Sequence, residues 1–302
     1  MSAQMDPGMT GKFEARYVAF LETISHLRPS LHRYCARMTG SVTDGEDIVQ
    51  EALFEAYRKL DKFDETRPLS PWLFRIAHNR SIDFLRRRGV RQETETAAME
   101  PDVVEPAQLS SPPVGRAVEH LVLALPPMER ACVLLKDVFD YTLEETAELV
   151  DSTVGGVKAA LNRGRTKLAK FAAPSAQKPA VDPELVQLSR LYVERFNRRD
   201  WDGLRELISA DARLTVADRF RGRMDESGYF GVYSRWPQPL WLATGEVDGR
   251  PAIIIHGQSA EGWVPHAFMT FEIENHHVAR VKDYIHCPWV LSAASEIVID
   301  PF

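Results

Sequence analysis

The sequence predicts a multidomain protein in which two all-α segments precede an α+β domain. Apolar residues recur at helical spacing from Phe13 to Leu168, with one interruption at 92–115 that is rich in Glu, Pro and Ser. A Pro- and Ala-rich stretch ends at Pro183, and five of the six tryptophans lie beyond it, where several segments read as strands. These changes predict helical segments at 11–91 and 116–172, linkers at 92–115 and 173–183, and an α+β domain at 184–302.

The composition predicts a cytoplasmic protein. The chain is 44% hydrophobic and 26% charged, as soluble globular proteins are. No stretch reaches the ~18 apolar residues of a membrane span, and the N-terminus lacks a signal pattern. The three cysteines are odd in number and lack metal-ligand spacing. We therefore expect reduced thiols, no membrane partner, no metal and no cofactor.

An acidic helix is predicted from Thr43 to Leu60. Thr43 suits an N-cap, and Glu46 three residues later completes a capping box. Apolar residues step by four along one face, and acids outnumber bases on the rest. The acidic surface is either solvated or a docking face for a basic partner.

A basic helix is predicted from Pro71 to Arg91, with Pro71 in its first turn and Gly89 at its end. Six arginines stand against the single acid Asp83. Together with Asn79, they suit a helix that grips phosphates and presents an amide to bases. The alternative is a solvated arginine face on an ordinary bundle helix.

A helix-turn-helix is predicted from Tyr141 to Leu168. Thr142 and Glu145 form a capping box, the turn spans 150–152, and Thr153 caps a second helix that carries five cations and no acid. Its first turn would enter the major groove. Gly155 and Gly156 either weaken this helix by ~1 kcal/mol each or allow close approach to DNA. The alternative is a plain bundle corner.

The last domain opens with a helix from Glu184 to Arg198, followed by a short helix and a strand. Further strands are predicted at 239–246, 252–257, 266–273 and 278–285. The segments 247–249 and 275–276 read as hairpin turns. Helices followed by an antiparallel sheet give an α+β fold.

Two pairs of motifs carry a family resemblance. D-G-E-D-I-V-Q-E-A, followed by W-L-F-R-I-A-H-N-R-S-I-D-F-L-R-R-R, resembles region 2 of sigma-70 factors of the extracytoplasmic-function type. L-P-x-x-E-R and V-G-G-V-K-A-A-L-N-R-G-R resemble region 4 of the same family. The resemblance implies binding to core RNA polymerase, through the β′ clamp helices and the β flap, and to promoter DNA.

The resemblance also implies which residues make these contacts. Polymerase contacts are expected at Asp44, Glu46, Asp47, Ile48, Gln50 and Glu51. Contacts to the minus-ten element are expected at Phe63, Trp72, Arg75, His78, Asn79, Arg80, Arg86, Arg87 and Arg88. Contacts to the minus-thirty-five element are expected at Thr153, Val154, Gly155, Gly156, Lys158, Asn162, Arg163 and Arg165.

The segment R-F-N-R-R-D-W-D-G-L-R-E-L-I-S-A-D-A-R-L-T-V resembles the start of SnoaL-like domains, which have a cone-shaped α+β fold. The resemblance implies a regulatory extension that contacts the sigma domains within the chain. We expect no catalytic residues in it. A pocket for an unknown small ligand is expected among Tyr192, Trp241, His256, Phe268 and Tyr284.

The predicted function is that of a sigma factor regulated by its C-terminal domain. One rival hypothesis is a ligand-responsive helix-turn-helix regulator that acts without polymerase. The other is an enzyme of the polyketide-cyclase type with a DNA-binding appendage.

Overall fold

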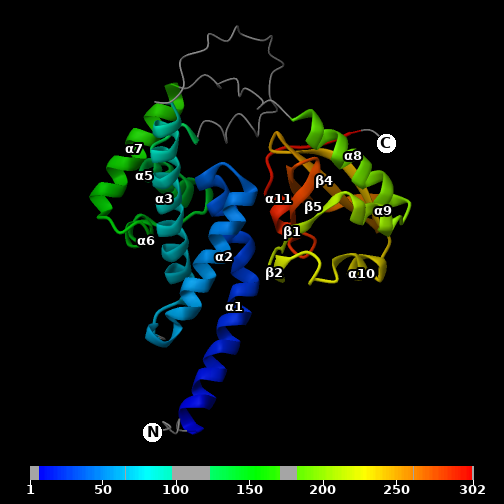
Figure 1. The fold of residues 1–302 in the computed structure, drawn as a ribbon. Coiled ribbons are helices and arrows are strands. Elements are labelled where there is room, and N and C mark those ends of the chain that lie inside the picture. The colour runs from blue at the N-terminus through cyan, green and yellow to red at the C-terminus, as the bar shows by residue number, and fades with distance from the viewer. Residues whose placement is uncertain (1–6, 65, 97–122, 171–181, 261, 301–302) are drawn as a thin grey trace. The chain divides into compact units, whose positions relative to one another are not determined.

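The computed structural model of the chain describes residues 7–64, 66–96, 123–170, 182–260 and 262–300 (Figure 1). The chain divides into two compact units, Met1–Ser175 and Ala176–Phe302. The first unit contains helices and the second a sheet with helices, which confirms the predicted fold class. No helix among the described residues is both long and apolar enough to cross a membrane.

The first half of unit 1 is a three-helix bundle. It comprises α1 (Pro7–Thr39), α2 (Val42–Arg58), a 3-10 turn η1 (Leu60–Lys62) and α3 (Leu69–Thr96). Buried apolar side chains of all three helices form its core, among them Tyr34, Val49 and Phe74.

The predicted cap of α2 is wrong. Ser41 is the N-cap, and its hydroxyl accepts a hydrogen bond from the backbone N–H of Asp44 at 3.2 Å. Glu46 does not reach back to form a capping box. It is buried instead, and its carboxylate pairs with the Arg28 guanidinium at 2.5 Å. Glu46 therefore forms a long-range ion pair instead of the capping box that the local pattern predicted.

The predicted end of α3 at Gly89 is also wrong, because the helix continues to Thr96. An interior glycine costs a helix ~1 kcal/mol, and the Arg, Gln and Glu residues after Gly89 have good helix propensity. The first residues of the predicted linker are consequently helical. Residues 97–115, its remainder, lie outside the described residues.

The second half of unit 1 contains α5 (Pro127–Val133), a π-helical turn η2 (Leu134–Val138), α6 (Leu143–Leu149) and α7 (Val154–Lys170). The capping box is confirmed, since Thr142 and Glu145 exchange both hydrogen bonds. Thr153 caps α7 by accepting the Gly156 N–H at 3.0 Å. The helix-turn-helix is thus present at the predicted place.

One continuous core joins the two halves of unit 1. The Phe139 ring lies 5.9 Å from that of Tyr34, and the Tyr141 ring lies 5.6 Å from that of Phe74. The buried Arg130 guanidinium of α5 donates hydrogen bonds to the carbonyls of Met38, at the end of α1, and of Leu125. The two halves are therefore packed against each other.

Unit 2 is built on a seven-stranded sheet in the order β2-β1-β6-β5-β4-β3-β7. Its strands are β1 (Ile208–Val216), β2 (Phe220–Arg223), β3 (Leu240–Val247), β4 (Arg250–Ser259), β5 (Gly262–Glu274), β6 (His277–Asp283) and β7 (Ile297–Ile299). Only β1 and β6 pair in parallel; the other neighbours are antiparallel. The four predicted strands after 239 correspond to β3–β6.

Helices α8 (Pro183–Asn197), α9 (Trp201–Glu206) and α10 (Tyr229–Ser234) pack on the sheet, and α11 (Pro288–Ser292) lies against β5. Both predicted turns are confirmed, because Asp248, Gly249, Asn275 and His276 all have positive φ. The short elements β2, α10, α11 and β7 were not predicted. Segments of three to six residues contain too few positions to show a period.

Candidate nucleic-acid interface

The basic helix α3 has a buried face and an exposed face. Leu73, Phe74 and Ala77 lie in the core, whereas Arg75 and Asn79 are exposed. The three-arginine run 86–88 is exposed as well. Arg86 pairs with Asp83 at 3.2 Å and Arg88 lies 3.8 Å from Asp44. Arg87 makes no ion pair with another described residue.

His78 does not belong to this exposed face, contrary to the expected minus-ten contact. It is 3% exposed, and its Nδ1 lies 2.8 Å from the Tyr34 hydroxyl. Burial lowers the pKa of His78 to about 4. The imidazole is therefore a neutral member of the core, because its helical position faces α1.

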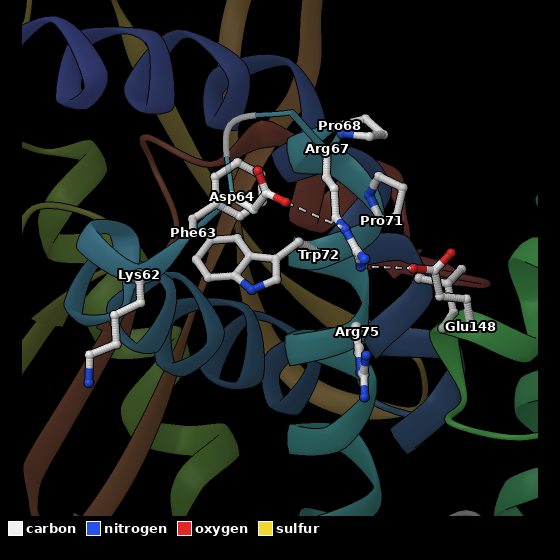
Figure 2. Close-up of a pocket in the computed structure, with 10 residues that line it drawn as sticks. Lys62, Phe63, Asp64, Arg67, Pro68, Pro71, Trp72, Arg75 and Glu148 are labelled. Carbon is white, nitrogen blue, oxygen red and sulfur yellow. Dashed lines mark ion pairs between the residues drawn. The ribbon is translucent and has the colours of Figure 1, made fainter.

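A pocket of about 540 Å³ lies at the start of α3, between the loop before it and the end of α6 (Figure 2). The Phe63 and Trp72 rings are 4.7 Å apart at this pocket. Trp72 is half-buried: it packs against the core and also lines the pocket. Aromatic faces beside the cations Lys62, Arg67 and Arg75 are the groups that bind an unstacked base and its phosphates.

Two acids of the helix-turn-helix reach the cations of this site. Arg67 Nη1 lies 3.7 Å from Glu148 Oε1, and Arg75 Nη2 lies 3.2 Å from Asp151 Oδ1. Figure 2 shows the Arg67 side chain extended between Asp64 and Glu148. Sequence reasoning missed both acids, because nothing local relates α6 to α3. Their contacts place negative charge beside the cations Arg67 and Arg75.

The acidic helix α2 exposes fewer of the expected residues than its pattern suggests. Glu46 and Ile48 are buried and do not reach its surface, because both face the other helices of the bundle. Glu51 is exposed, and the remaining expected residues, Asp44, Asp47 and Gln50, are half-buried. Phe54 was not predicted; it is 64% exposed, an unusual position for a phenylalanine.

The outer face of α7 is exposed at Thr153, Gly155, Gly156, Lys158, Asn162, Arg163 and Arg165, with Val154 half-buried. Arg163 and Lys167 both donate to Glu129, and Arg165 pairs with Asp137. The hydrogen bonds from Lys167 and Arg163 hold the pKa of Glu129 below its usual range. A Cβ at Gly155 would meet only Thr153 Oγ1, at 3.9 Å, so the start of α7 is open on this side.

The five residues expected to form a pocket in unit 2 do not line the cavities found there. Tyr192, His256, Phe268 and Tyr284 are at most 3% exposed, and Phe268 stacks on Tyr284 at 4.7 Å. Trp241 is half-buried and lies 6.3 Å from Trp263. Tyr192 packs with Ala267 and Met269, and Phe268 between them points to the opposite face of the sheet. The five side chains therefore cannot converge.

In the part of the chain that the structure describes, no three His, Cys, Asp or Glu side chains are grouped so that they could hold a metal ion. Cys35, Cys132 and Cys287 are buried, and these three form no disulfide.

Known proteins resemble both halves of unit 1. The family model described as Sigma-70 region 2 matches residues 23–91, and that described as Sigma-70, region 4 matches residues 115–168. The ECF RNA polymerase sigma factor SigW of Bacillus subtilis (strain 168) is 32% identical over 164 residues, which cover 50% of this chain and 88% of that relative.

The ECF RNA polymerase sigma factor SigG of Mycobacterium tuberculosis (strain ATCC 25618 / H37Rv) is 30% identical over 217 residues, covering 61% of this chain and 58% of SigG. Among solved structures, the extracytoplasmic function sigma factor SigJ of Mycobacterium tuberculosis covers 87% of this chain and 95% of its own, with 16% identity and a TM-score of 0.36.

Proposed function

Since this chain belongs to the extracytoplasmic-function RNA polymerase sigma factors, we propose that the surfaces described above make its contacts with core polymerase and promoter DNA. Matches to region 2 and region 4, in that order, carry the family assignment and do not favour a regulator that acts without polymerase. Sigma factors bind RNA polymerase and promoter DNA; the assignment of residues to each contact is our proposal.

Polymerase docks on the exposed side of α2. The side chains in reach are Asp44, Asp47, Gln50 and Glu51, joined by Phe54. An exposed aromatic side chain beside acids suits a partner surface that combines cations with an apolar contact. Glu46 and Ile48 act indirectly, because they hold α2 in place from the core.

The minus-ten element is read by α3 and the pocket at its start. Phe63 and Trp72 receive a base, and Asn79 contacts another. The cations Arg75, Arg80, Arg86, Arg87 and Arg88 bind phosphates, which supply affinity without sequence preference. The minus-thirty-five element is bound by the exposed start of α7, from Thr153 to Lys158. Asn162, Arg163 and Arg165 contact the DNA backbone.

Unit 1 represents a closed state of the factor. Glu148 and Asp151 engage Arg67 and Arg75, and a shared core holds the region 4 half on the region 2 half. The pocket at the start of α3 cannot take a base and its phosphates while Glu148 and Asp151 engage its cations, although the start of α7 stays exposed. Binding to polymerase therefore has to separate the two halves.

The C-terminal unit regulates this transition, and we infer no catalysis by it. Two observations support the regulatory role. The unit is compact by itself, and it follows the last residue matched by the region 4 model. A sigma factor acts by recognition, so an additional folded domain serves most simply as a control on opening.

Run-off transcription with core RNA polymerase tests the function. The full chain is compared with a version that ends at Ser175, the last residue of unit 1. Transcripts from either protein support the sigma function. More transcript from the short version identifies unit 2 as an inhibitor, and its loss identifies unit 2 as a required part. If neither protein binds core polymerase, the proposed contacts are wrong.

A further inference from the structure

A small cavity beside α10 in unit 2 carries a further inference. It has a volume of about 140 Å³ and lies between α10, the β1–β2 hairpin and the residues that follow β6. We propose that it binds a single-ring aromatic hydroxy acid, with the hydroxyl at its floor and the carboxylate at its mouth. This site does not depend on the proposed promoter or polymerase contacts.

The floor of the cavity is the carboxylate of Asp283, which is 0% exposed. The hydroxyls of Tyr229 and Tyr233 both donate to its Oδ2, each at 2.6 Å, and the backbone N–H of Ile285 donates to Oδ1 at 2.8 Å. A buried carboxylate is costly even when it is hydrogen-bonded, and an apolar residue would serve packing better. Packing alone therefore does not account for Asp283, and we attribute its presence to a ligand.

The directions of the hydrogen bonds to Asp283 determine which ligand group can bind at the floor of the cavity. Both tyrosine protons are directed at Asp283, so the two phenolic oxygens at the floor keep lone pairs that can accept a hydrogen bond from a ligand. A ligand must bring a donor to this end. A hydroxyl satisfies the floor, whereas an aliphatic or halogenated end would leave it unpaired.

The mouth of the cavity has the opposite character. Arg219 is exposed there and makes no ion pair with another residue that the structure describes. His286 lies beside it, with its ring 5.5 Å from that of Trp236. A guanidinium and an imidazole present donors, and a carboxylate is the matching ligand group.

The walls and the volume set the size of the ligand. Leu214, Phe220, Trp236 and Ile285 give an apolar lining between floor and mouth. An engineered apolar cavity of about 150 Å³ in another protein holds one benzene molecule. The cavity here therefore accommodates one aromatic ring, and its polar substituents project to the two ends.

Isothermal titration of the full chain with para-hydroxybenzoate, phenol and benzoate tests the proposal. We expect para-hydroxybenzoate to bind more tightly than the other two, since each of those lacks one polar end. Val232 lines the cavity and is 47% exposed, so Val232→Trp should block the site without disturbing the core. Loss of binding in this variant would locate the ligand.

Arg219→Gln should lower the affinity for para-hydroxybenzoate about tenfold, as expected for losing one charge-assisted hydrogen bond. The affinity for phenol should not change. Arg221→Gln is the matched control, because Arg221 is exposed two residues away and does not line the cavity. Binding that survives Val232→Trp, or an equal effect of both arginine variants, would overturn the site. So would failure of all three probes to bind.

Discussion

Arg75 of α3 and Asp151 of the helix-turn-helix are joined by an ion pair of 3.2 Å. Arg75 belongs to the helix proposed to read the minus-ten element, and Asp151 to the turn before the helix proposed for the minus-thirty-five element. Asp151 has a φ of 53°, in the left-handed region, within the turn that precedes α7. The contact therefore links the two helical halves of unit 1, beside the surfaces proposed for promoter DNA.

We expect the double variant Glu148→Gln, Asp151→Asn to bind minus-ten DNA more tightly in the absence of polymerase. Each exposed ion pair contributes about 0.5 kcal/mol, so together they change the affinity about fivefold. Asparagine tolerates the left-handed backbone at 151. Fluorescence anisotropy with a labelled minus-ten strand measures the change. Glu144→Gln is the matched control, since Glu144 is exposed on the same helix; equal gains in both variants would refute a specific masking role.

Asn79→Ala should change base preference at one minus-ten position. Asn79 is exposed on α3, and an amide that reads a base contributes about 1–3 kcal/mol of discrimination. Competition between base-substituted promoters in run-off transcription reveals the position. A uniform loss across all promoters would show that Asn79 contacts the backbone.

Arg87→Gln should reduce the salt dependence of promoter binding. One lost phosphate contact lowers the slope of log K against log salt by about 0.7–0.9. Because Arg86 already pairs with Asp83, Arg86→Gln should have a smaller effect. Titrations at several salt concentrations compare the two variants, and an unchanged slope for Arg87→Gln would exclude the contact.

His78 should make unit 1 sensitive to acid. Its folded-state pKa is about 4 against an ordinary 6.5, so below pH 6.5 the unfolded chain binds a proton that the folded chain does not. The resulting stability loss begins near pH 6.5 and reaches about 3 kcal/mol near pH 4. Urea unfolding across this range should show a steeper pH dependence for the wild type than for His78→Gln. Parallel curves would contradict the burial of a neutral imidazole.

Arg130→Met should destabilise unit 1 by about 3 kcal/mol, because it leaves buried carbonyls without a donor. The guanidinium donates to Met38 and Leu125, and burial lowers its pKa to about 10. Thermal unfolding measures the loss. Met128→Leu on the same helix is a control, since Met128 is 40% exposed.

Features that depend on neighbouring residues could be predicted from the sequence. The Thr142–Glu145 capping box, the turns at Asp248 and Asn275, and the helix-turn-helix depend on neighbours a few residues away, and all are present. The motif pairs that identify the family are likewise contiguous. Where a distant partner competed, as Arg28 did for Glu46, the local prediction failed.

The sequence by itself determined the family, the order of the helical and α+β parts, and the basic helix with its exposed arginines. Only the tertiary structure decided which side chains remain available for contacts. It buried His78 against Tyr34, paired Arg75 with Asp151, and gathered Tyr229, Tyr233 and Asp283 at one cavity. The reason is that burial and charge pairing depend on elements far apart along the chain, and the period of a single helix or strand does not reveal its neighbours.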